Sequence, residues 1–180
     1  MGRGTERGIN PVGEISIKLW RRPMHPSDVK NAVNLFEVMA ELELVISEFY
    51  KTVGETWKEN ETFWFGLSRQ EVSHAENIRR MADILKSAPQ QFEFGRPFNI
   101  TTVSTVTSGV RNLIKRVKNG EYKEKAILFL ARDLEQSIVE TKYTELLRTT
   151  ETEYNKMIKA IVSQTEEHKQ ALIKKIGETK

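Results

Sequence analysis

Six polar residues fall on the otherwise apolar faces of predicted helices, and most of them are of types that bind metal ions. They are Glu43, Glu71, His74, Glu135, Thr165 and His168. The E-x-x-H spacing of Glu71 and His74 places both side chains on one helix face, about one turn apart. A carboxylate and an imidazole in this arrangement can hold a divalent ion, and the carboxylate can bridge to a second one. The alternative is a polar pair that is only hydrogen-bonded.

Glu43 is predicted to face the core, because Met39 precedes it and Ile46 follows it at helical spacing. Tyr50 lies on the same apolar stripe, and we expect its hydroxyl to donate a hydrogen bond near a metal site. The alternative for Tyr50 is a core tyrosine whose hydroxyl is satisfied elsewhere. Glu135 interrupts the apolar stripe of another helix in the same way. Since a buried carboxylate is costly unless it is paired, carboxylates from several helices indicate a shared cation.

The composition limits the kinds of site that this chain can build. The 180 residues include no cysteine, which excludes disulfides, thiolate zinc sites, cysteine-ligated iron–sulfur clusters and thiol catalysis. Any metal must therefore be held by histidines and carboxylates. The formal net charge of +3 is too small to indicate nucleic-acid binding, so we expect no nucleic-acid partner.

Neither a membrane segment nor a secretion signal is recognisable in the sequence. No stretch approaches the roughly 20 apolar residues that are needed to cross a bilayer. The first residues, MGRGTERGINPVGE, lack the apolar core of a secretory signal. We therefore expect a cytoplasmic protein with no membrane partner.

Apolar residues that recur every three or four positions predict four long helices, over about residues 28–58, 62–87, 121–148 and 152–177. Ser27 is expected to cap the first helix. Residues 88–120 would form a long crossover that carries a short helix over 110–118. Residues 1–26 are predicted to be a tail or an arm, and residues 27–180 to be one domain. This plan is typical of an all-α, up-down-down-up four-helix bundle of the ferritin-like type.

Four short motifs resemble the helices of the ferritin-like superfamily. The rubrerythrins and related di-iron carboxylate proteins are the most similar, although a chain without cysteine has no rubredoxin domain. The resemblance covers residues 30–86 and 121–176. The motifs are Phe36-x6-Glu43-x6-Tyr50, Gln70-Glu71-Val-Ser-His74-Ala-Glu-Asn, Leu134-Glu135-Gln-Ser-Ile and Glu166-Glu167-His168.

The resemblance implies one or two iron ions, with manganese or zinc as alternatives. It implies that Glu71 bridges the two ions and that Glu43 and Glu135 are terminal ligands. His74 and His168 would each bind one ion. Members of the family oxidise ferrous iron or reduce peroxide, so we expect an oxidoreductase. Because the family commonly dimerises through bundle faces, the resemblance also implies a homodimer or a higher oligomer. A peroxidase of this kind would need an external protein as its electron donor.

The fourth helix departs from the family pattern at Thr165, where a second E-x-x-H would require glutamate. Three outcomes are open for the second ion. It could be held only by Glu135, His168 and water, a π-bulge could turn Gln164 or Glu166 inward, or only one ion could bind. The alternative function is a degenerate ferritin-like scaffold. Such a structural or protein-interaction module would hydrogen-bond its polar core residues to one another without metal chemistry.

Overall fold

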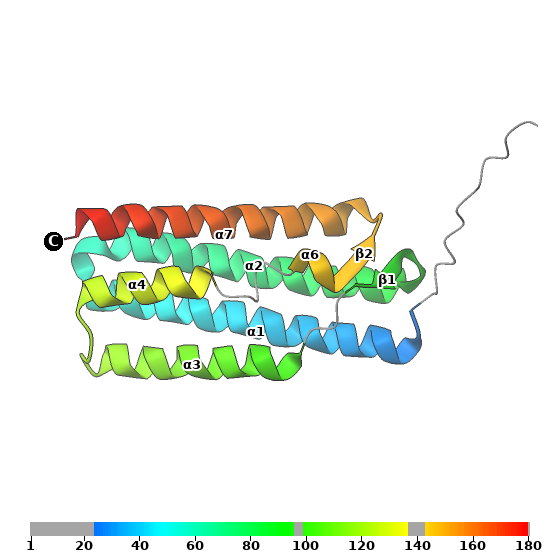
Figure 1. Ribbon diagram of the computed structural model, residues 1–180, viewed down its shortest axis with the longest axis horizontal. Coiled ribbons are helices and arrows are strands. Elements are labelled where there is room, and N and C mark those ends of the chain that lie inside the picture. Colours follow the sequence, from blue (N-terminus) through cyan, green and yellow to red (C-terminus); the bar gives the residue numbers. More distant parts are fainter. Residues whose placement is uncertain (1–23, 96–98, 137–142, 180) are drawn as a thin grey trace, which may run out of the picture.

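The structure, a computed structural model, describes residues 24–95, 99–136 and 143–179, and it confirms a mostly helical fold. Labels follow Figure 1. Among the described residues, no helix has both the length and the apolar character needed to cross a membrane. The long helices are α1 (Pro26–Thr56), α2 (Glu61–Ser87), α3 (Ile100–Lys118), α4 (Glu124–Glu135) and α7 (Thr152–Glu178). The shorter elements are η1 (Lys58–Asn60), η2 (Pro89–Gln91), β1 (Phe92–Phe94), α6 (Tyr143–Leu146) and β2 (Leu147–Thr149).

The long helices lie with their axes close to parallel, as Figure 1 shows. α1 packs on α2 and α3, α2 also packs on α7, and α4 packs on α7. α2 and α4 run in one direction, whereas α1 and α7 run in the opposite one (Figure 1). α3 lies along the outside of α1 and returns the chain from the end of α2 to the start of α4 (Figure 1). The apolar faces of these helices therefore meet in one core.

The start of α1 differs in one detail from the sequence-based expectation. His25, and not Ser27, is the N-cap residue, because the Nδ1 atom of His25 accepts a hydrogen bond from the backbone N–H of Ser27 at 3.3 Å. Pro26 has no N–H to satisfy and therefore suits the first helical position. The predicted tail or arm lies outside the described residues up to residue 23, whereas Met24 is buried.

The crossover carries a longer helix than predicted, since α3 begins at Ile100 and not near residue 110. Threonine, serine and valine have low helix propensity, which is why the sequence pattern did not indicate a helix there. Packing on α1 outweighs that propensity, and an exposed ion pair between Arg111 and Glu41, at 2.6 Å, links the two helices at the surface. The buried positions nevertheless have helical spacing: they are Val103, Thr107, Val110, Ile114 and Val117.

The predicted continuous helix over residues 121–148 is wrong, because α4 ends at Glu135 and β2 occupies its last part. β2 pairs antiparallel with β1, so that Phe92 lies opposite Thr149 and Phe94 opposite Leu147. Residues 137–142 of the predicted helix lie outside the described residues. Leu146 continues the apolar period, so the local pattern alone indicates a helix. The strand partner is distant in the sequence, and a local pattern cannot reveal it.

We predict that Gly95→Ala lowers the free energy of unfolding by about 1–3 kcal/mol, because the backbone must shift to make room. A Cβ atom at residue 95 would lie 2.0 Å from the carbonyl oxygen of Glu145. In the control Gly66→Ala, the new Cβ atom meets nothing within 4 Å. This control should gain up to about 1 kcal/mol, since alanine favours a helix. Urea unfolding followed by circular dichroism measures both changes, and a Gly95→Ala variant as stable as the wild type would contradict the close approach.

Candidate metal centre

The five predicted metal ligands converge inside the bundle. α1 supplies Glu43, α2 supplies Glu71 and His74, α4 supplies Glu135, and α7 supplies His168. None of these residues is more than 3% exposed. They form two groups, and within each group the possible ligand atoms lie within 4.8 Å of one another. One group is Glu43, Glu71 and His74, and the other is Glu71, Glu135 and His168.

Glu71 lies between the two imidazole rings. Its Oε2 atom is 2.9 Å from Nδ1 of His74, and its Oε1 atom is 2.9 Å from Nδ1 of His168. The two rings are stacked, with centroids 5.6 Å apart. Burial opposes ionisation of Glu71, but hydrogen bonds and charge from His168 and His74 outweigh it and lower the pKa of Glu71 to about 2. Each carboxylate oxygen therefore faces its own ring, as a bridging ligand between two sites requires.

Tyr50 contacts the cluster through Glu135. The hydroxyl of Tyr50 donates a hydrogen bond to Oε1 of Glu135 at 2.5 Å, and Nδ1 of His168 lies 3.3 Å from the same oxygen. Burial and the negative charge of Glu71 raise the pKa of Glu135. Burial by itself lowers the pKa of His168, but the carboxylates of Glu135 and Glu71 raise it to about 10. As expected from the sequence, Tyr50 donates a hydrogen bond beside the cluster, and the acceptor is Oε1 of Glu135.

The donor set of this cluster fits a cation. The Oε2 atom of Glu135 is buried and has no hydrogen-bond partner among the described residues. Such a group is costly in a protein interior, and coordination to a metal ion would satisfy it. Carboxylate oxygens combined with imidazole nitrogens suit iron, manganese or zinc. The structure therefore holds the side chains that a buried metal site needs, in two groups that share Glu71.

The helix that carries Thr165 is regular. This excludes the π-bulge, one of the three outcomes considered for the second metal ion. α7 is an uninterrupted α-helix, so a π-bulge near Gln164 or Glu166 is not present. Glu166 is exposed to solvent. Thr165 is 7% exposed, and its hydroxyl has no hydrogen-bond partner among the described residues. Thr165 thus occupies a core position one turn before His168 without supplying a carboxylate.

Two glutamines touch the site: Gln70, which the sequence indicated only as part of a motif, and Gln164, which was expected to turn inward only through a π-bulge. The Oε1 atom of Gln164 lies 2.9 Å from Nε2 of His74, and the Oε1 atom of Gln70 lies 2.8 Å from Nε2 of His168. Each glutamine precedes the histidine of its own helix by four residues, but this spacing does not indicate the contact, because each one bonds the histidine of the other helix. Gln164 reaches the site from a regular helix, and it does so as a partner of an imidazole.

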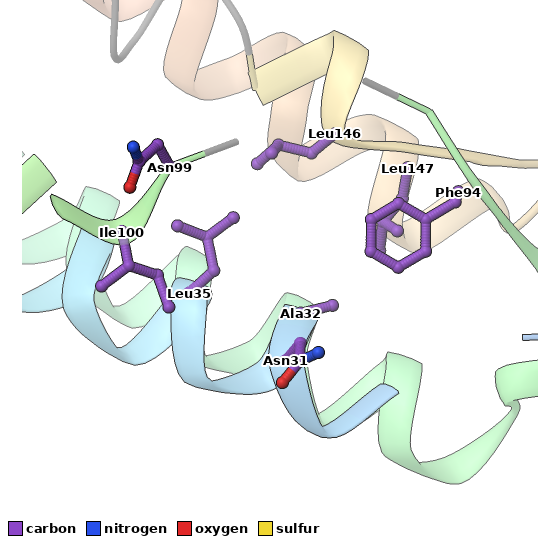
Figure 2. A pocket seen from close by; sticks show the side chains of 8 residues that line it. All are labelled: Asn31, Ala32, Leu35, Phe94, Asn99, Ile100, Leu146 and Leu147. Atoms are coloured by element: carbon purple, nitrogen blue, oxygen red, sulfur yellow. The ribbon is translucent and has the colours of Figure 1, made fainter. Parts of the chain in front are cut away.

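A cavity of about 500 Å³ lies elsewhere, where α1, α3, α6 and β2 meet (Figure 2). Its walls are mainly aliphatic side chains and Phe94, and its polar lining residues are Asn31 and Asn99. None of the described residues that line it is titratable, so the cavity offers no general acid, general base or charged metal ligand. The described lining of this cavity therefore adds no titratable side chain to those of the buried cluster.

We predict that the chelator-treated protein loses stability as the pH rises from about 6 to about 10. The pKa of His168 is raised from 6.5 to about 10, so its contribution is complete below pH 6.5 and is lost as the pH rises through 10. Glu71 acts at the acid end, since its contribution is present above pH 4.5 and is lost as the pH falls towards 2. Urea unfolding across this pH range measures both effects. His168→Gln should flatten the alkaline decline, and an unchanged decline would contradict this assignment.

Comparisons of the chain with protein-family models, with curated proteins and with solved structures found no match. The chemistry open to this site is therefore inferred from its own residues and distances. Those residues are a shared carboxylate, two further carboxylates and two imidazoles, all of them buried.

Proposed function

We propose that this chain is a ferritin-like metalloprotein that holds two divalent ions in its buried cluster. Iron is the expected metal, with manganese or zinc as alternatives. The observation that carries the proposal is the position of Glu71, which belongs to both groups of possible ligand atoms. The helix directions support it, because α1 and α7 run against α2 and α4, and a long crossover joins α2 to α4 (Figure 1). That order is typical of ferritin-like bundles.

The residues divide into two ligand sets. Glu43 and His74 would complete one set around Glu71, and Glu135 and His168 would complete the other. A pair of iron ions held in this way supplies electron exchange between the ferrous and ferric states, which serves ferrous oxidation or peroxide reduction. We therefore propose an oxidoreductase of the ferroxidase or peroxidase type. As a peroxidase it would take its electrons from an external protein, since the chain has no cysteine to form a rubredoxin centre.

The side chains around the cluster orient Glu135 and shield one side of the cluster from water. Tyr50 holds Oε1 of Glu135 through its hydroxyl, which leaves the Oε2 atom of Glu135 available to a cation. Tyr50 is itself surrounded by fully buried aromatic side chains. Its ring stacks on that of Trp64, with the two ring centroids 5.8 Å apart. Water is therefore excluded on that side, and electrostatic attraction between the carboxylates and a cation is strengthened.

Thr165 makes the charge balance of the site unusual. Two divalent ions carry four positive charges, and the cluster offers three carboxylates to neutralise them. Because one positive charge is left in a buried place, we expect the second ion to bind more weakly than the first. A glutamate in place of Thr165 would complete the neutralisation.

The metal content of the purified protein tests the proposal directly. Protein prepared without chelator should carry one or two iron ions per chain, measured by elemental analysis. His74→Ala should remove most of this metal, because it takes one imidazole from the cluster. His25→Ala is the matched control, since His25 is exposed and lies outside the cluster. A wild-type protein that carries no metal and does not take up ferrous iron added anaerobically would favour the metal-free scaffold.

Thr165→Glu tests the charge argument. We predict that it increases metal stoichiometry when the free metal is limiting, because it adds the fourth carboxylate. Thr165→Val, which keeps the shape of threonine without its hydroxyl, should leave the stoichiometry close to that of the wild type. Titration with ferrous iron under anaerobic conditions measures both variants. If Thr165→Glu binds the second ion no better than the wild type, the charge deficit does not limit binding.

A further inference from the structure

We infer that Gln70 and Gln164 are positioning residues for the metal centre. Each one fixes an imidazole of the opposite helix so that its Nδ1 atom, and not its Nε2 atom, faces the metal position. The inference deepens the proposed function and rests on it, because it names the ligand atom of each histidine and the groups that select that atom.

The two hydrogen bonds are crossed between α2 and α7. Gln70 on α2 contacts His168 on α7, with Oε1 and Nε2 2.8 Å apart. Gln164 on α7 contacts His74 on α2, with Oε1 and Nε2 2.9 Å apart. In both helices the glutamine lies one turn before the histidine, and the two helices run in opposite directions (Figure 1). The two pairs are therefore related by an approximate local twofold arrangement.

The chemistry of the amide decides which ring nitrogen carries the proton. The Oε1 atom of glutamine can only accept a hydrogen bond, so the Nε2 atom that faces it must be the donor. A neutral imidazole has one N–H group, and with that group at Nε2 the lone pair is at Nδ1. Without a metal, Nδ1 of each ring lies 2.9 Å from an oxygen of Glu71, and because a carboxylate can only accept, this contact is favourable only with a proton at Nδ1 as well. A cation bound beside Glu71 would replace the Nδ1 proton, and each glutamine would then keep the remaining proton at Nε2, so that the Nδ1 lone pair faces the cation.

Because an amide is uncharged, each glutamine adds no further negative charge beside the ligands. A carboxylate acceptor would add a negative charge behind each imidazole and would raise its basicity. Gln70 and Gln164 fix the ring orientation without that charge. Both are only half-buried, so they lie between the buried rings and the molecular surface. The crossed bonds thus hold the two stacked rings, whose centroids are 5.6 Å apart, from the outer side of the cluster.

The crossed arrangement makes a specific prediction for variants that remove one acceptor. Gln164→Leu should weaken the ion bound by His74, although Gln164 and His74 lie on different helices. Gln70→Leu should weaken the ion bound by His168. The loss of a hydrogen-bond partner of a metal-binding histidine costs about 10–100-fold in affinity. Titration of the chelator-treated protein with Zn²⁺ under a competing chelator measures this change for each variant.

Nuclear magnetic resonance of the Zn²⁺-loaded protein gives a readout that a merely structural role would not move. Long-range ¹H–¹⁵N correlation should show the wild-type His74 and His168 rings with the proton at Nε2 and the metal at Nδ1. Each Gln→Leu variant should lose this pattern at the histidine of the other helix. Gln164→Glu and Gln70→Glu keep an acceptor and should retain it. Gln170→Leu, an exposed change on α7, is the matched control.

The outcomes separate this inference from the proposed function. A wild-type protein that binds no Zn²⁺ would overturn both. If the wild type binds Zn²⁺ but the Gln→Leu variants bind it equally tightly with unchanged ring signals, the positioning role alone is wrong. Urea unfolding of each chelator-treated variant shows whether the fold is intact. Should a leucine variant fail to fold, the Gln→Glu variants decide, because a metal at Nε2 in either of them would contradict the inference.

Discussion

A fully buried carboxylate between two imidazole rings is the interaction on which the rest of this molecule depends. Removing Glu71 from water is costly, and the cost is offset only while His74 and His168 stay on either side of it. The rings belong to two different helices, so the helix packing has to be accurate at this level of the bundle. The fold can thus be understood as the set of contacts that keeps α2 and α7 in this relation while α1 and α4 supply the remaining carboxylates.

Local periodicity was enough to locate the centre. Glu43 and Glu135 interrupt apolar stripes, and a polar residue at such a position must either leave the core or find a partner there. The structure shows both of them buried beside Glu71. The same reasoning placed Thr165 in the core, because it lies one turn before His168 on the same face of the helix. These inferences succeed because they depend only on the geometry of a single helix.

What the sequence did not reveal depends on contacts between distant segments. The threonine- and serine-rich run of α3 forms a helix because it packs on α1, and propensity alone disfavours it. The pairing of β1 with β2 joins strands that no local pattern connects. Gln70 and Gln164 are the clearest case, because each bonds a histidine of the other helix, and the spacing along either helix does not show which face meets which.

The small β1–β2 ladder has a consequence for the axial register of the bundle. β1 follows α2 and β2 precedes α7, so the ladder couples the end of one helix to the beginning of the other. Thr149 strengthens this coupling, since its hydroxyl donates to the carbonyl of Gln91 at 2.9 Å. If α7 slid by one residue, each side chain would move about 1.5 Å along the axis and turn by about 100°. Such a slip would turn His168 away from Glu71, so the three residue pairs of this ladder, at one end of the bundle, oppose a shift of the buried ligands.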